Sequence, residues 1–174
     1  SGNIGGTGAM VANPTGGKFN LTGTNTYSGA TTISGGTFQI GVAGSLGSGS
    51  YAAAIANAGS FLYSSSANQT LSGAITGVGG LQKDLNAAST LTLSGANSYT
   101  GGTNINAGTL QVNSSGALGS SGVISMGGGV LQYTSNNTAD YSSRFSTTAG
   151  QAYNVDTNGQ NVTWASALTS SGAT

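Results

Sequence analysis

The chain has 174 residues, with three basic side chains, three acidic side chains, and neither histidine nor cysteine. Its net charge of zero excludes the basic surface that nucleic acid or an anionic membrane would attract. The missing histidine and cysteine exclude disulfides, thiol nucleophiles and the usual zinc and haem ligands, so we expect no metal and no cofactor.

The beginning of the chain does not look like a targeting segment. SGNIGGTGAM at 1–10 lacks the basic head and apolar centre of a signal peptide, and the chain does not start with methionine. No apolar run approaches the roughly 20 residues that a membrane-spanning helix needs. We therefore expect a section of a longer protein.

Composition alone leaves disorder as a rival to a folded structure. Only 3% of the residues are charged and 32 are glycine, which also occurs in flexible tracts. However, 36% are hydrophobic, and these residues alternate with polar ones in short stretches. Such alternation is typical of half-buried strands, so the sequence predicts an ordered, all-β chain.

Short strands are predicted along the whole chain, in order FNL at 19–21, TFQIG at 37–41, LTL at 91–93 and TLQVN at 109–113. Glycine, asparagine and serine separate them, and no window has helical periodicity. Strands of this length that recur through a chain favour a solenoid or a propeller.

An internal repeat decides between these two folds. LTGTNTYSGATTISGGTFQIG at 21–41 returns as LSGANSYTGGTNINAGTLQVN at 93–113, and residues 18–50 share 14 identities with 90–122. The offset is 72 residues, whereas a propeller blade would repeat after about 40–50. A parallel β-helix coil takes somewhat over about 20 residues, so we expect three coils per repeat.

Applied to the whole chain, this coil length predicts a single β-helical segment of seven or eight coils. At a spacing of about 4.8 Å per coil, the rod would be about 35 Å long. We divide it into about two and a half repeats, at 2–73, 74–145 and a partial copy at 146–174.

Alternation along each strand predicts which side chains point inward. No coil buries enough apolar surface alone, so stability must accumulate along the stack, and coils at a cut end should fray or associate. The predicted core consists of Phe19, Leu21, Ile33, Phe38, Ile40, Leu62, Leu71, Leu91, Leu93, Ile105, Leu110, Val112, Leu131 and Phe145.

Catalytic groups are scarce. A serine nucleophile needs a base, which only Lys18 or Lys83 could supply, and Lys83 with Asp84 is expected in a solvated turn. Paired carboxylates of glycoside chemistry lie about 5–10 Å apart, and only Asp140 and Asp156 could meet across coils. We therefore expect no enzyme and assign no catalytic, cofactor-binding or metal-binding residue.

Glycine-rich stretches give no further site. GVGGL at 77–81 is followed neither by a helix nor by the lysine of a phosphate-binding loop. The nonapeptide of calcium-binding β-rolls is absent as well.

Two pairs of tyrosines are equivalent in the repeat, Tyr27 with Tyr99 and Tyr63 with Tyr133. They could form a stripe on which sugars stack. We favour half-buried rings at coil corners with their hydroxyl groups in water. Trp164 occurs once, so no aromatic array can be built on it.

Asparagines and threonines complete the repeat. Asn25 and Asn97 precede the tyrosines, where they would form turns or pair their amides with the backbone. Thr31-Thr32 and Thr90/Thr92 suggest the flat threonine ladder of an ice-binding solenoid. That ladder would have to recur in every coil, whereas identity returns only every 72 residues.

The segment 90–122 resembles the passenger-associated transport repeat of bacterial autotransporters, and 18–49 resembles a more diverged copy. GVGGLQKDLNAAST at 77–90 is similar to the lead-in of that family, whereas GTGAMVANPTGGKF at the first copy has Val11 in place of the lysine. The segments 51–76 and 123–174 match only in general texture.

The resemblance implies a right-handed parallel β-helix from a passenger that is exported through an outer-membrane barrel and displayed on, or released from, the bacterial surface. Our leading hypothesis is a structural, non-enzymatic stalk or adhesive section that supports export and folding and continues into further repeats. Alternatives are an adhesin or fibre subunit that binds glycans or other copies of itself, a polysaccharide-acting enzyme, and an ice-binding solenoid.

Overall fold

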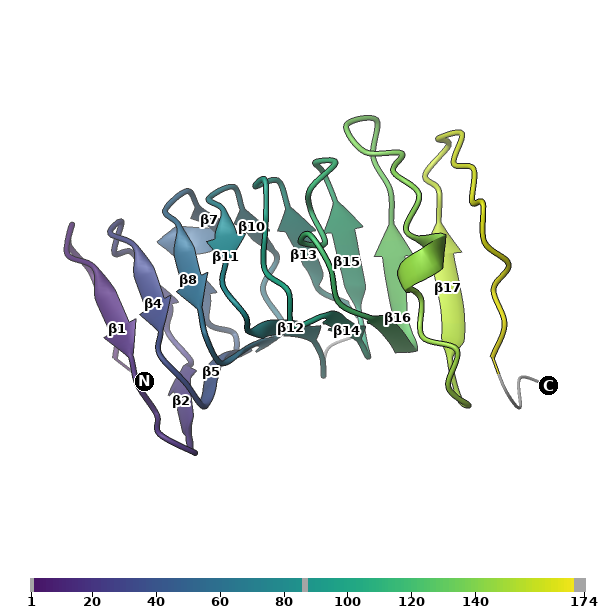
Figure 1. The fold of residues 1–174 in the computed structure, drawn as a ribbon. Coiled ribbons are helices and arrows are strands. Elements are labelled where there is room, and N and C mark those ends of the chain that lie inside the picture. The colour runs from purple at the N-terminus through teal and green to yellow at the C-terminus, as the bar shows by residue number, and fades with distance from the viewer. Residues whose placement is uncertain (1, 86–87, 171–174) are drawn as a thin grey trace.

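The computed structural model describes residues 2–85 and 88–170. The chain is all-β and winds into a β-solenoid of about seven turns, with parallel strands stacked from coil to coil. Figure 1 shows these strands side by side along the rod, from the purple N-terminal end to the yellow C-terminal end. The predicted fold class is therefore confirmed, while the right-handed sense of the coils stays a prediction.

Three faces enclose the core. Face A consists of β1 (Met10–Ala12), β4 (Thr31–Ile33), β8 (Ile55–Asn57) and β11 (Ile75–Thr76). Face B consists of β2 (Lys18–Leu21), β5 (Thr37–Val42), β9 (Ser60–Ser65), β12 (Gly80–Lys83), β14 (Thr103–Ile105) and the first part of β16 (Ile124–Gln132). Face C consists of β7 (Ser50–Tyr51), β10 (Gln69–Leu71), β13 (Thr90–Leu93), β15 (Thr109–Val112), the second part of β16, and β17 (Ala152–Asp156).

The remaining elements are short. β3 (Thr24–Asn25) pairs with β6 (Ser45–Leu46), and the Gln69 side chain continues this ladder by bonding both the N–H and the carbonyl of Leu46. The described residues also include two turns of 3₁₀ helix, η1 (Gly47–Gly49) and η2 (Ser142–Arg144).

β16 turns the corner between faces B and C without a break in the strand. Its first part pairs with β14 and its second part with β15, and the register towards β17 shifts between Gly127 and Val130. Gly128 lies in this corner at φ +129°, a conformation that residues with a Cβ rarely adopt. The glycine run therefore lets one strand belong to two faces.

Coil length varies between neighbours. On face B, Phe19 lies beside Phe38, Phe38 beside Phe61, and Phe61 beside Leu81, so these coils take 19, 23 and 20 residues. Three coils are therefore shorter than the 72-residue repeat. The expectation that one repeat equals three whole coils is wrong, because each of these coils contains fewer residues than one third of the repeat.

The extra residues advance the repeat by one face. Leu21 lies in β2 on face B, but its equivalent Leu93 lies in β13 on face C. Likewise β4 on face A is equivalent to β14 on face B, and β5 on face B to β15 on face C. A 72-residue step thus covers three coils and one further face. The division of the chain into repeat copies remains a sequence-based prediction.

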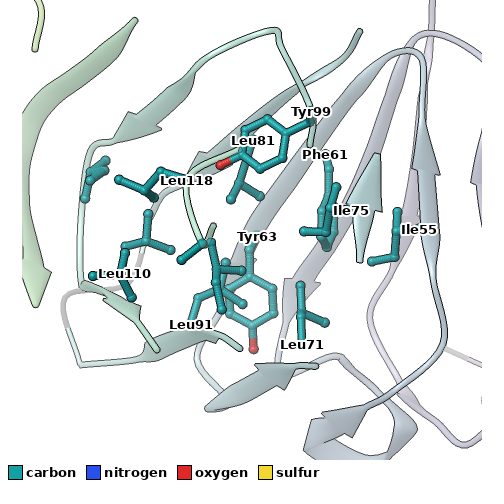
Figure 2. Close-up of a cluster of buried hydrophobic side chains, with 14 of the residues drawn as sticks. Ile55, Phe61, Tyr63, Leu71, Ile75, Leu81, Leu91, Tyr99, Leu110 and Leu118 are labelled. Atoms are coloured by element: carbon teal, nitrogen blue, oxygen red, sulfur yellow. The ribbon is translucent and has the colours of Figure 1, made fainter. Parts of the chain in front are cut away.

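The core is one continuous stack of apolar and tyrosine side chains, shown in part in Figure 2, where Phe61, Leu81, Leu91 and Leu110 from different faces point toward one another. Each such side chain is worth about 1.5–3 kcal/mol when it leaves water. Twelve of the fourteen predicted core residues belong to this cluster; Phe19 and Leu62 do not.

Both exceptions have a physical reason. Phe19 stacks on Phe38 with ring centroids 6.1 Å apart, but it lies in the first strand of face B and remains 39% exposed. Leu62 is buried as predicted, at 9% exposure, but it is not part of the core cluster. Its neighbours Phe61 and Tyr63 belong to that cluster, so alternation turns Leu62 the other way, between Gln39 and Gln82 on face B.

Candidate binding surfaces

The asparagines of the repeat tie three successive coils together. Asn25 accepts a hydrogen bond from the N–H of Ile4 in the preceding coil at 3.0 Å and donates to the carbonyl of Ser45 in the next coil at 3.1 Å. Asn97 does the same between Ile75 and Ala117, at 2.7 Å each. The expected pairing of these amides with the backbone is confirmed, and the role is structural.

The tyrosines of the repeat lie inside the solenoid, contrary to both interpretations of the sequence. The rings of Tyr27, Tyr63, Tyr99 and Tyr133 are at most 1% exposed. They can neither stack on a sugar nor place their hydroxyl groups in water. Alternation alone predicts this burial. Each tyrosine lies an even number of residues after an inward-pointing leucine or phenylalanine, so its side chain points the same way.

Threonine supplies the hydrogen bonds that the buried tyrosines need. The hydroxyl of Thr31 lies 2.8 Å from both Tyr27 Oη and Tyr51 Oη, and Thr103 lies 2.7 Å from Tyr99 Oη. Burial raises the pKa of Tyr27 and of Tyr99 well above the ordinary value. These hydroxyl pairs are neutral parts of the core.

Lys83 is not in a solvated turn. It is the last residue of β12, fully buried, with Nζ 5.7 Å from the ring centroid of Tyr63. Burial lowers its pKa, and the neighbouring Asp84 opposes this effect. The turn prediction failed because Lys83 occupies the inward column of face B, between Tyr63 and Ile105.

The acidic side chains Asp140 and Asp156 each bond a nearby turn and a residue about one coil away. Asp140 accepts hydrogen bonds from the backbone N–H groups of Ser142 and Ala165. The side chain of Ser142, followed by these two backbone groups, lowers the pKa of Asp140. Asp156 accepts from Gln132 and from the N–H of Asn158. The two carboxylates share none of these partners, and no group of three acidic side chains forms among the described residues.

Outward-pointing polar side chains form a ladder on face C, here called the glutamine ladder. Thr92 donates to Gln111 at 3.0 Å, Gln111 to Gln132 at 2.7 Å, and Gln132 to Asp156 at 2.7 Å. The last bond is the main cause of the lowered pKa of Asp156. Each glutamine amide has a second N–H that the ladder bonds do not use, so this surface can bind a polar partner.

A second ladder runs beside the first at the end of the same strands. Asn113 donates to Ser94 at 3.0 Å and accepts from Thr134 at 2.9 Å and from Asn136 at 3.1 Å. The outer surface of face C is therefore covered by amides and hydroxyls over several coils.

The threonine ladder expected of an ice-binding surface is interrupted. On face A, Thr32 lies between Val11 and Ala56. On face C, Thr92 lies between Thr70 and Gln111. Neither column repeats threonine in every coil.

Arg144, which the sequence did not single out, closes the turn at 118–122. Its guanidinium donates to the carbonyls of Gly122 at 3.0 Å, Gly119 at 3.1 Å, Leu118 at 2.7 Å and Ser121 at 2.6 Å. A single arginine outside any repeated motif gives no sequence signal for this role.

An aromatic cluster follows at the C-terminal end of the core. The ring of Phe145 meets Tyr153 and Trp164 edge-on, with centroids 6.0 and 5.3 Å apart. Trp164 Nε1 donates to Tyr133 Oη at 3.3 Å. The one tryptophan of the chain therefore packs beside Phe145.

Two hollows flank the segment 142–148, which contains η2. The first has a volume of about 470 Å³ and lies between residues 122–123 and 143–148. The second, about 220 Å³, lies between 142–147 and residues 166–169. Ser143, Phe145 and Thr147 line both.

No helix among the described residues is long and apolar enough to cross a membrane.

The comparison with protein families confirms the resemblance found in the sequence. The passenger-associated transport repeat matches residues 16–40 and 88–112. These two segments are 72 residues apart, and each spans about one coil, from β2 to β5 and from β13 to β15.

The chain is also 47% identical over 72 residues to a protein named adhesin BmaC autotransporter, from Brucella suis biovar 1 (strain 1330). The match covers 41% of this chain and 2% of the adhesin, so the chain corresponds to a small part of that relative. No solved structure matches.

Proposed function

We propose that this chain is a structural, non-enzymatic length of an autotransporter passenger, displayed outside the bacterial cell as part of a stalk or adhesive fibre. The observation that carries the proposal is the placement of the two family matches, each of which is one coil of an unbroken solenoid core. The similarity to an autotransporter adhesin also supports a passenger role.

The geometry suits a load-bearing rod. Every coil is held to the next by parallel backbone pairing and by amides such as Asn97. Because each coil completes its core only against its neighbours, the rod can form outside the cell by adding coils to those already folded.

Display can be tested by placing the chain between a signal peptide and an outer-membrane translocation domain. We expect surface exposure and resistance to added protease. A variant with Leu93→Asp and Leu110→Asp should lose both, because it puts charge into the core. A matched variant with Thr92→Asp and Asn104→Asp, at outward positions of β13 and β14, should keep both. Retained display and protease resistance in the core variant would contradict the proposal.

Adhesion through the outer surface is a second candidate function, favoured by the glutamine ladder on face C. Two modes are open, binding to a glycan and binding to another copy of the chain. Sedimentation at increasing concentration tests the second mode: self-association should rise with concentration and weaken in Gln111→Ala/Gln132→Ala. A monomer at all concentrations would exclude it.

A further inference from the structure

The structure points to a binding site for a neutral saccharide in the two hollows beside Phe145. The inference deepens the adhesive function proposed above by naming its place and ligand class. It can fail while the chain remains a folded passenger section, because nothing in the rod depends on a ligand.

The hollows occur where the regular wall of the solenoid ends. Face B is continuous from β2 to β16. Beyond it, β17 pairs with β16 from Gly127 onward, whereas Ile124 meets the next coil through a bridge to Phe145 and a bond from the N–H of Ser146 to its carbonyl. Residues 146–151 form no further strand there. The larger hollow lies between this segment and Val123.

The lining has the chemistry of a sugar site. Eight of the fourteen lining residues carry hydroxyl groups. The hydroxyls of Ser142, Ser146, Thr148 and Tyr153 already bond within the protein, and that of the exposed Ser143 is directed to solvent or ligand. Val123, which is 57% exposed, supplies an apolar surface for the C–H groups of a pyranose ring, and Phe145, which is 6% exposed, also lines both hollows. The larger volume of about 470 Å³ is within the usual range of ligand sites, about 300–1,000 Å³.

The charges in the lining of the hollows favour a neutral ligand. The one charged residue in the lining is Arg144, and its guanidinium is already directed at four backbone carbonyls. An anionic ligand would have to draw it away from them. No carboxylate lines either hollow to bind a cation.

The chain carries its own reporter for this site. Trp164 is its single tryptophan, and the indole packs against Phe145, which lines both hollows. A ligand that contacts the Phe145 segment should therefore change tryptophan fluorescence.

The test titrates the 174-residue chain with cellotetraose, chitotetraose and, as the anionic comparison, tetragalacturonate, while following Trp164 fluorescence. We expect a saturable change with at least one neutral oligosaccharide at millimolar Kd, as fits a small open site. Ser143 is exposed and lines both hollows, so Ser143→Gln should fill them and weaken binding at least tenfold. The matched variant Ser72→Gln, at an exposed serine far along the chain, should bind like the parent.

Circular dichroism of each variant shows whether the rod is intact. If Ser143→Gln does not fold, Thr148→Gln, in the wall of the larger hollow, takes its place. Three results would overturn the site: no response to either neutral oligosaccharide, a response to tetragalacturonate alone, or binding that a folded Ser143→Gln leaves unchanged.

Discussion

Leu21 and Leu93 are equivalent in the internal repeat, yet Leu21 lies on face B and Leu93 on face C. Both are buried in the same continuous core. The same motif therefore fits the core from two different faces. This explains why the motif is kept in sequence while its position around the rod changes.

Asn97→Ala should be strongly destabilising, because it leaves the N–H of Ile75 and the carbonyl of Ala117 without their partner. A buried group left unpaired costs about 1–3 kcal/mol, so we expect a loss of about 3 kcal/mol in the free energy of unfolding. Urea denaturation measures it. Asn104→Ala, at an exposed position of β14, should change stability by less than about 0.5 kcal/mol. Equal effects of the two changes would refute the linking role of Asn97.

Val42→Gly should stabilise the rod. Val42 is 70% exposed and has φ +57°, where a β-branched side chain is strained. Releasing a strain of about 1–2 kcal/mol outweighs the entropy cost of glycine, so we expect a gain of about 0.5–1 kcal/mol by thermal unfolding. Val11→Gly, at another exposed valine in a strand, is the control and should destabilise by about 1 kcal/mol. A loss of stability in Val42→Gly would rule out the strain.

Alkaline pH should unfold the protein through its buried tyrosines. Burial raises the pKa of Tyr133 from 10.0 to about 12, and the pKa values of Tyr27 and Tyr99 rise as well. The unfolded chain then loses phenolic protons first, so stability is complete below pH 10 and falls as pH rises above it. Stability measured against pH should show this decline, together with delayed tyrosinate absorbance.

Tyr99→Phe separates the titration from general alkaline damage. It removes one titrating phenol, so the decline above pH 10 should become shallower. At neutral pH it should cost about 1 kcal/mol, because Thr103 loses its partner. An unchanged alkaline slope would mean that Tyr99 does not contribute.

Lys83→Met should stabilise the protein at neutral pH. The buried amine has a lowered pKa, because its charged form is disfavoured inside the core. An unbranched apolar side chain of similar length removes that cost, for a gain of about 1 kcal/mol. The gain should shrink as pH rises toward 10.5, where the unfolded lysine also becomes neutral. The exposed Lys18→Met serves as control.

The sequence predicts burial correctly at positions where apolar residues alternate with polar ones along a strand. Leu91, Leu93, Leu110 and Val112 are buried as predicted, because a strand admits only two directions for a side chain. Leu62 shows the limit of this argument, since a shift of one residue reverses the direction.

Tyrosine and lysine were misplaced for a different reason. Their polar ends suggested water, but Tyr99 finds Thr103 inside the core, and Lys83 lies at an inward position of β12. The hollows beside Phe145 were also not predictable, because they depend on where a strand fails to form, and no residue pattern marks that position.

The contacts that join the coils are mostly between neutral groups, as in the bonds from Asn25 to Ser45 and from Gln111 to Gln132. Dissolved salt screens interactions between exposed charges, and neutral hydrogen bonds offer it nothing to screen. Stability should therefore change little between dilute buffer and moderate salt, whereas a high concentration of a salting-out salt should raise it by strengthening apolar burial. The bonds between coils thus contain little that a change of ionic strength could weaken.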